Sequence, residues 1–261
     1  MVLLAGYAVI VEPTWLQVRR VEIPLDHLPP GFAGYRIAFV SDFHLDDGTP
    51  EDFLAGLARL INDQQPDVVL LGGDYFSADP ARYRAMLIQA VRQIDAPDGV
   101  LAVLGNHDHW RGADEVRAVL SESGARTLEN QVIRIERGSE QLYLAGLGDV
   151  WEQADRLDLL SQQIPENAAA VLLVHEPDIA DQAAATGKFG LQLSGHSHGG
   201  QVNLPFIGPP IRPNLGERYP IGLQRAGGLP VYTTRGIGMT ALAVRFNCRP
   251  EVTVIDLVSA P

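Results

Sequence analysis

The amino-acid sequence predicts an α/β protein in which two β-sheets pack together and helices cover their outer faces. Three observations predict it. Short apolar runs alternate with amphipathic segments, a hairpin pattern interrupts this alternation, and strand patterns return near the C-terminus. Apolar runs bounded by breakers are typical of strands buried on both faces, whereas a hairpin is typical of antiparallel strands.

Each expected element follows from its own pattern. The segment that begins at Pro50 carries acids in its first turn and apolar residues at helical spacing, which favours a helix start there. Residues 131–146 predict a hairpin across a Gly-Ser turn. The remaining strands are expected at 35–42, 66–74, 99–106, 169–176, 189–196, 231–236, 241–247 and 251–258, and the helices at 50–64, 80–94, 113–123, 152–164 and 177–186.

The composition limits the classes of partner. The 261 residues carry 20 Lys and Arg against 32 Asp and Glu, a formal net charge of −12. Because non-specific nucleic-acid binding depends on neutralising phosphates with Lys and Arg, we expect no nucleic-acid partner. Bound cations reverse the local potential at a site, so a phosphorylated substrate is compatible with this charge. Cys248 is the one cysteine, which excludes a disulfide within the chain and leaves the redox compartment open.

The apolar N-terminal segment, residues 1–12, has two interpretations. The run MVLLAGYAVI is too short to span a bilayer and lacks the basic residues of a signal peptide. It is either a first strand or buried tail, or the remnant of a membrane anchor. We expect a cytoplasmic or peripheral-membrane location with some membrane contact, and an extracytoplasmic location stays open.

Five short polar motifs stand where predicted strands end, at the edge where open α/β sheets bind ligands. Singly, each motif has an ordinary structural explanation, such as a turn or a hydrogen-bonded core histidine. The ordered combination has few such explanations and predicts a metal site. The motifs are Asp42-Phe43-His44, Gly73-Asp74, Gly105-Asn106-His107-Asp108, His175 and Gly195-His196-Ser197-His198.

The residue types indicate the chemistry. Carboxylates together with imidazoles suit Mn, Fe or Zn, whereas an all-oxygen set would suit Mg²⁺ or Ca²⁺. The D-x-H and H-x-H spacings place two side chains on the same side of an extended segment. Two cations about 3.5–4 Å apart need a shared ligand, and a carboxylate can bridge them.

The series D-x-H, G-D, G-N-H-D, H and G-H-S-H over residues 42–198 resembles the calcineurin-like metallophosphoesterase superfamily. The strings LLGGDYF, LLVHEPD, LSGHSHGGQ and TRGIG…RFNCRPEVT are similar to a branch of bacterial membrane-associated phosphodiesterases, which includes UDP-diacylglucosamine hydrolase-type enzymes. The resemblance implies a four-layer α/β/β/α sandwich of two mainly mixed sheets, one domain over residues 1–261 and two divalent metal ions, Mn, Fe or Zn.

The resemblance also implies a role for each motif residue. His107 would contact the phosphoryl oxygen or protonate the leaving oxygen. Asp108 would either orient His107 or cap the following turn. One metal ion would be bound by Asp42, His44 and His198, the other by Asn106, His175 and His196, with Asp74 as the bridge.

One departure from the family bears on the substrate. Phosphoprotein phosphatases of the superfamily carry an arginine within G-D-x-x-D-R-G, but no arginine follows Gly73-Asp74 here before Arg82. A site without that dianion clamp suits a phosphodiester or pyrophosphate better than a phosphoserine. Arg235 is a candidate for binding the substrate, whereas Arg245 is expected to be a surface cation on a C-terminal strand.

Apolar and aromatic residues beside the motifs are further candidates for substrate contact. The Pro/Gly-rich loop 199–229 follows the last motif and contains seven glycines and five prolines. It is either an active-site wall that recognises a hydrophobic group through residues such as Phe206, or a rigid loop covering the sheet edge. Tyr75, Phe76, His109 and Trp110 would either line the cleft or pack inside the fold.

Together, the motifs predict a dinuclear-metal-dependent phosphoesterase, a phosphodiesterase or pyrophosphatase in which metal-activated water attacks a lipid- or nucleotide-linked phosphate. The expected partner is therefore a phosphorylated small molecule or lipid. A cyclic-nucleotide phosphodiesterase is one alternative. A non-catalytic scaffold on the same fold is another, although the full ligand set argues against it.

Overall fold

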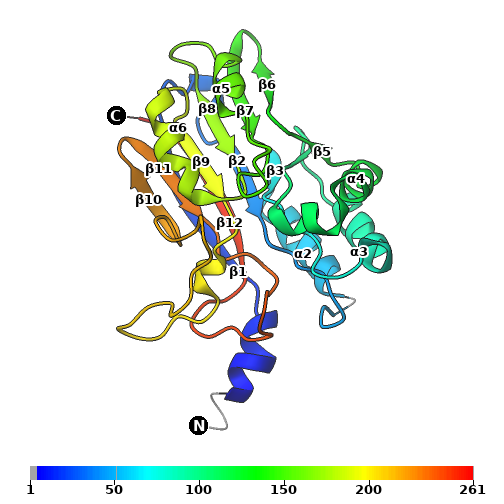
Figure 1. The fold of residues 1–261 in the computed structure, drawn as a ribbon. Helices are drawn as coiled ribbons and strands as arrows, with labels where there is room; N and C mark the ends of the chain where they lie inside the picture. Colours follow the sequence, from blue (N-terminus) through cyan, green and yellow to red (C-terminus); the bar gives the residue numbers. More distant parts are fainter. Residues whose placement is uncertain (1–4, 51, 261) are drawn as a thin grey trace.

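The computed structural model describes residues 5–50 and 52–260, and these residues form two mixed sheets of six strands each (Figure 1). The first sheet has the order β1-β12-β2-β3-β4-β5 and the second β10-β11-β9-β8-β7-β6. Strands β2 to β5 run parallel to one another, as do β7, β8, β9 and β11. Strand β12 is antiparallel to β2, while β6 and β10 form antiparallel edges of the second sheet.

The strands of the first sheet are β1 (Gln17–Leu25), β2 (Arg36–Val40), β3 (Val68–Leu71), β4 (Val100–Ala102), β5 (Arg126–Thr127) and β12 (Glu251–Ser259). The strands of the second are β6 (Gln131–Arg137), β7 (Glu140–Gly146), β8 (Ala170–Leu173), β9 (Leu191–Ser194), β10 (Gly222–Ala226) and β11 (Leu229–Thr233). The predicted hairpin is β6–β7, paired antiparallel.

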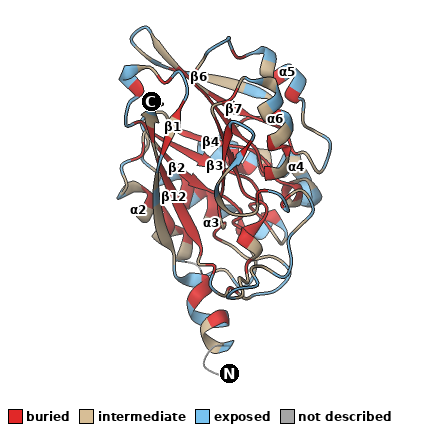
Figure 2. Ribbon diagram, turned by 90° about the vertical axis from the view of Figure 1, so that its left-hand side faces the viewer, coloured by how far each residue is buried: buried red, intermediate tan, exposed pale blue. Residues whose placement is uncertain are grey.

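The core lies in three apolar layers. Buried residues of both sheets, such as Phe39, Leu70, Val171 and Leu193, meet between the sheets. Helices α2 (Phe53–Asn62), α3 (Pro80–Arg92) and α4 (Asn106–Ser123) cover the outer face of the first sheet, and α5 (Leu157–Gln162) and α6 (Ala180–Thr186) cover that of the second. Most of the sheet residues between these helices are buried (Figure 2). The predicted α/β/β/α sandwich is confirmed.

Local sequence explains where the helices begin and end. Pro80 stands in the first turn of α3, and the Asp79 side chain accepts a hydrogen bond from Ala81 N. Helix α4 begins at Asn106 and ends at the left-handed Gly124, and its backbone is non-helical at Gly112. The part after this kink coincides with the predicted helix 113–123, and the part before it was not predicted. Helix α5 is shorter than the predicted 152–164, because residues 150–153 form a turn instead.

Two expected strands are wrong. Residues 241–247 form bends, since Ala241 and Asn247 have left-handed backbones and only Phe246 makes an isolated bridge, with Val202. The expected first strand or buried tail is wrong for residues 5–11: Tyr7–Val11 (η1) form a short helix that leaves Val9, Ile10 and Val11 exposed. Residues 1–4 lie outside the described part. Among the described residues, no helix is long and apolar enough to cross a membrane.

Candidate metal centre

The carboxyl ends of parallel strands from both sheets meet at one end of the sandwich, and the expected ligands follow those ends. In the first sheet, Asp42 and His44 follow β2, Asp74 follows β3 and Asn106 follows β4. In the second, His175 follows β8, and His196 and His198 follow β9. All seven side chains are buried.

The backbone at these strand ends is unusual. Five of the seven expected ligands have positive φ angles, between 47° and 67°. Non-glycine residues adopt this region rarely, and it concentrates at functional sites where the surroundings hold it in place. The five are Asp42, His44, Asp74, His196 and His198.

The expected first metal site is formed by Asp42, His44 and His198, whose ligand atoms all lie within 4.8 Å of one another. The Nε2 atoms of His44 and His198 are 3.0 Å apart, and His198 Nε2 is 3.5 Å from Asp42 Oδ1. Two imidazole nitrogens and a carboxylate oxygen this close together form a donor set suited to one divalent cation.

The expected second site contains Asp74, His175 and His196. His175 Nε2 lies 3.2 Å from Asp74 Oδ2 and 3.3 Å from His196 Nδ1. Asp74 Oδ2 is also 3.4 Å from His44 Nε2, which places this carboxylate between the two groups. The arrangement is the one that a bridging carboxylate requires.

Hydrogen bonds outside the cluster fix which ring nitrogen points inward. His175 Nδ1 donates to Gly72 O at 2.7 Å, and His196 Nε2 donates to Asn214 O at 2.8 Å. His44 Nδ1 pairs with Ser77 Oγ at 2.8 Å. Each ring therefore directs its other nitrogen at the cluster, as outer hydrogen bonds do for metal-binding histidines.

The donor set fits divalent cations. Asp42 Oδ2 and Asn106 Oδ1 are buried without a hydrogen-bond partner, which is costly unless another group pairs with them. Burial lowers the pKa of His44 to about 3 and that of His196 to about 4, so both rings are neutral and available as ligands. Burial raises the pKa of Asp42 to about 6. Burial would also raise the pKa of Asp74, but His175 and His44 hold it well below its usual value.

His107 lies at the edge of the cluster. Its backbone N–H donates to Asp74 Oδ1 at 2.9 Å, and its ring is 4.7 Å from the His44 ring. Although a ring nitrogen of His107 falls within 4.8 Å of His44 and Asp74, the side chain is only partly buried. Burial lowers the pKa of His107. This position suits a group that contacts a substrate bound beside the metals.

Comparison with known proteins identifies the family. Residues 35–200 match the family described as calcineurin-like phosphoesterase. The chain belongs to this family. It is 34% identical to the uncharacterized metallophosphoesterase YkuE of Bacillus subtilis over 97% of this chain and 90% of that one. It is 31% identical to the phosphodiesterase YaeI of Escherichia coli over 97% of this chain and 92% of that one. The chain is thus a metal-dependent phosphoester hydrolase.

Solved structures share the fold. A Thermus thermophilus sulfate thiohydrolase, SoxB, superposes with a TM-score of 0.53 at 17% identity and covers 88% of this chain. A putative 5′-nucleotidase from Staphylococcus aureus superposes with a TM-score of 0.50 at 15% identity and covers 87%. This chain spans 57% and 55% of those two chains.

Asp108 caps the backbone and does not orient His107. Its carboxylate accepts hydrogen bonds from the N–H groups of Asp74 and Tyr75 at 2.8 Å and of Gly105 at 2.9 Å. The Nδ1 atom of His107 has no protein partner. Asp108 was expected to orient His107 or to cap the following turn. It instead caps backbone that precedes it in the chain, and so fixes the Gly73–Asp74 turn against α4.

Tyr75, a predicted substrate contact, is a core residue instead, and Phe76 packs inside the fold, which is one of the two positions expected for it. Tyr75 is fully buried, and its hydroxyl lies 3.0 Å from Val103 O, within hydrogen-bonding distance. Phe76 is also fully buried in the layer between the first sheet and its helices. The backbone of Asp74 is left-handed, and the chain after it turns so that Tyr75 and Phe76 both pack into this layer.

The two C-terminal arginines have different surroundings, and one of them differs from expectation. Arg245 is wholly buried rather than a surface cation, and its guanidinium donates to the carbonyls of Gly238, Cys248, Arg235 and Gly236. The backbone turns around this side chain, which explains why no strand forms there. Arg235 is partly exposed and lies 3.4 Å from Glu251. Its expected contact with substrate stays a prediction.

Two further residues near the cluster, Trp151 and Glu176, were not predicted from the sequence. The Trp151 ring lies 5.8 Å from the His196 ring and 6.0 Å from that of Trp110, which in turn lies 4.7 Å from His107. The buried Glu176 carboxylate accepts hydrogen bonds from Val150 N and Trp151 N and thereby holds this turn. The signal was the string LGDVW at the end of β7, on the same sheet edge as the other motifs.

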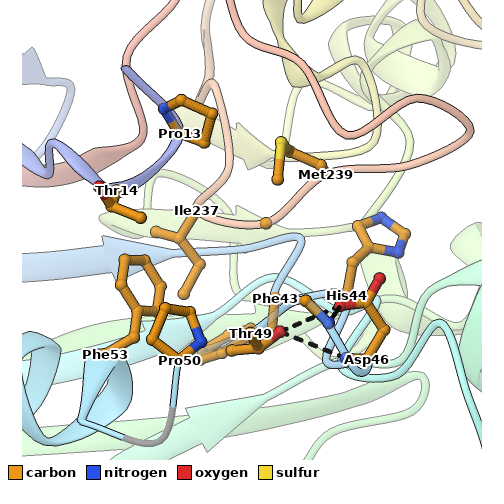
Figure 3. Close-up of a pocket in the computed structure, with 12 residues that line it drawn as sticks. Pro13, Thr14, Phe43, His44, Asp46, Thr49, Pro50, Phe53, Ile237 and Met239 are labelled. Atoms are coloured by element: carbon orange, nitrogen blue, oxygen red, sulfur yellow. Dashed lines mark hydrogen bonds between the residues drawn. The ribbon is translucent and has the colours of Figure 1, made fainter. Parts of the chain in front are cut away.

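A pocket lies beside His44, between the N-terminal segment, the start of α2 and the segment after β11 (Figure 3). It is mainly apolar, and its lining includes Phe43, Phe53, Ile237 and Met239. Hydrogen bonds between Asp46 and Thr49 brace one wall. The full lining is Pro13, Thr14, Phe43, His44, Asp46, Gly48, Thr49, Pro50, Phe53, Ile237, Gly238 and Met239.

Proposed function

We propose that the chain hydrolyses a phosphodiester or pyrophosphate bond with two divalent cations, and that its substrate carries a lipid or nucleotide group. The main support for this proposal is that the two ligand groups converge on Asp74, with the partly exposed His107 at their edge. The phosphodiesterase name of the Escherichia coli relative supports the same reaction class.

The protein groups would divide the work. The bound cations would supply an activated water and neutralise charge on the phosphate oxygens. Asp42, His44 and His198 would hold one cation and Asn106, His175 and His196 the other, with Asp74 shared. His107 would donate a hydrogen bond to a phosphoryl oxygen or a proton to the leaving oxygen.

The preference for a diester rests on which arginine side chains are free to bind a phosphate group. Arg82 pairs with Asp47 at 2.7 Å on the surface, and Arg235 lies beside Glu251. Arg245 is occupied by backbone carbonyls. Arg111 is exposed, and its charge acts on the His107 ring. One such cation suits one negative charge better than a monoester dianion, which binds best to a bidentate arginine fork.

Two features suggest the group attached to the phosphate. The small apolar pocket beside His44 would contact an apolar part of the substrate (Figure 3). The rings of Trp110 and Trp151 would stack on a base, which favours a nucleotide and keeps a cyclic-nucleotide phosphodiesterase as the second candidate. A UDP-linked lipid would use both features, in keeping with the resemblance to UDP-diacylglucosamine hydrolase-type enzymes.

The test compares matched aryl substrates with Mn²⁺, Fe²⁺ or Zn²⁺ added to metal-free protein. We expect kcat/KM for bis(p-nitrophenyl) phosphate to exceed that for p-nitrophenyl phosphate, and elemental analysis to find two metal ions per chain. Efficient hydrolysis of phosphoserine peptides with negligible diester hydrolysis would overturn the diester preference. Full metal content without hydrolysis of any phosphate ester would support a scaffold instead.

A further inference from the structure

Large exposed apolar side chains concentrate at one end of the molecule. In the described part of the chain eleven such side chains are exposed, and seven of them lie on three short segments. Phe206, Ile207 and Ile211 are at least 74% exposed, and Ile10 is 72% exposed. Contiguous exposed apolar residues mark interaction surfaces, whereas scattered ones need no explanation. The segments are residues 7–11, 204–212 and 239–247, which we call the apolar end surface.

Hydrogen bonds join the three segments into one unit. Arg245 N donates to Ala8 O at 2.9 Å, which ties the third segment to the N-terminal helix. Asn203 N donates to Phe246 O at 2.8 Å, next to the second segment. Gln201 Nε2 donates to Leu242 O at 2.6 Å. The N-terminal helix and the loop that contains residues 204–212, drawn in yellow, project from the same end of the fold (Figure 1).

The charges of these segments differ from those of the chain. The net charge is −12, yet residues 199–216 and 237–250 contain no acid. Glu12 is the one acid in residues 1–16; it is buried and accepts a hydrogen bond from Cys248 N. Arg212 is exposed, and the guanidinium of Arg249 lies 3.5 Å above the half-exposed Trp15 ring. Exposed apolar tips bordered by cations, without acids, complement an anionic lipid surface.

We propose that the apolar end surface docks the protein on an anionic phospholipid bilayer. The apolar side chains stand on projecting tips and do not line a groove, so they can enter the headgroup region separately. A tryptophan with a cationic neighbour is the type of group that lies at the level of the headgroups.

The docking surface is attached to the metal centre. Gly199 directly follows His198, and Cys248 Sγ donates to His198 O at 3.2 Å. A docked molecule would therefore hold its metal centre close to the lipid headgroups, where a lipid-linked phosphate would lie. That consequence rests on the proposed function, whereas docking itself requires no catalysis.

Vesicle co-sedimentation of the full chain tests docking without measuring hydrolysis. We expect binding to vesicles of phosphatidylcholine with phosphatidylglycerol, and weaker binding at high salt or without phosphatidylglycerol. The triple variant Phe206→Ser/Ile207→Ser/Ile211→Ser should bind at least about tenfold more weakly. Leu159→Ser/Leu223→Ser, which removes two exposed apolar side chains elsewhere, should bind like the wild type. Circular dichroism and metal content would show that each variant is folded.

Three outcomes would overturn docking: no vesicle binding by the wild type, equal binding by the triple variant, or an equal loss in the Leu159/Leu223 variant. Light scattering supplies a further check. If the wild type is a dimer that the triple variant converts to a monomer, and no vesicle binding occurs, the surface is a contact between copies of the chain. Docking with no phosphoesterase activity would leave this inference intact and remove the proposed function alone.

Discussion

Asp74 and His107 lie in the same cluster but differ in burial. Asp74 is fully buried, and its carboxylate lies beside rings of both ligand groups. Changing Asp74 to Asn would remove the negative charge that both cations share. We expect the variant to lose metal and diester hydrolysis together, as measured by elemental analysis and by turnover. Full metal retention by Asp74→Asn would contradict its bridging role.

His107 should behave in the opposite way. Because its ring is only partly buried at the edge of the cluster, His107→Asn should keep the metals. Turnover should fall by about 10²–10⁴-fold, the usual effect of removing a positioned acid. Single-turnover kinetics and metal analysis on one preparation would measure both. A variant without bound metal would assign His107 to the ligands.

Gly105 is required by close packing. A Cβ at this position would stand 2.4 Å from Asp74 Oδ1 and 2.8 Å from His175 Nε2. Gly105→Ala should therefore push both ligands apart and weaken metal affinity by about 10–100-fold. Metal titration monitors the change. Gly56→Ala on α2, where an added Cβ would meet only the end of the Arg59 side chain at 4.0 Å, is the matched control and should bind metal like the wild type.

At the scale of elements, Arg245 organises the segment between β11 and β12. Its buried guanidinium satisfies backbone carbonyls of residues 235–248 that no strand partner reaches. Gly236 in this segment also lies against the Asp42 side chain. A single buried cation thus supports one wall of the metal centre.

Removing that cation should be costly. Arg245→Met would leave several buried carbonyls without donors, so we expect a loss of about 2–4 kcal/mol in the free energy of unfolding. Denaturant unfolding measures it. The exposed Arg59 on α2 provides the comparison, because Arg59→Met should change stability by less than about 0.5 kcal/mol. Equal effects would show that the carbonyl contacts contribute little.

At the scale of the whole molecule, the metal centre joins the two sheets. Its ligands come from β2, β3 and β4 on one side and from β8 and β9 on the other. Bound cations would therefore hold together the ends of two sheets that otherwise meet through apolar packing.

Metal removal should accordingly destabilise the whole fold. A ligand present at about 1,000 times its Kd adds about 4 kcal/mol to stability, which is about 10 °C in Tm for a chain of this size. Differential scanning calorimetry before and after a chelator measures the shift, and added Mn²⁺ should restore it. An unchanged Tm in verified metal-free protein would show that the ligand cluster is stable by itself.

The sequence by itself determined the fold class and the candidate ligands. A strand that is buried on both faces appears in the sequence as an apolar run. The polar motifs at the ends of such strands can be recognised because they end those runs. The strands β1, β5 and β10 were not predicted. Strand β1 is half-buried and its partner is the C-terminal β12, at the other end of the chain, while β10 lies within residues 199–229, which were expected to form a loop. Residues 241–247 were expected to form a strand because their apolar residues alternate. This pattern does not show that the Arg245 side chain is buried.

Only the tertiary structure decided which neighbours of the motifs reach the site. Tyr75 follows a ligand in sequence but points into the core, whereas Trp151, from another strand end, stands over His196. Asp108 follows His107, yet its carboxylate turns to the backbone of residues 74 and 75. Sequence order places residues at a strand end, but the left-handed backbone at Asp42, His44 and Asp74 sets the direction of each side chain. Local sequence does not favour this backbone at non-glycine residues. Hydrogen bonds between neighbouring strand ends support it, such as Asp42 N to Gly73 O and His44 N to Asp74 O.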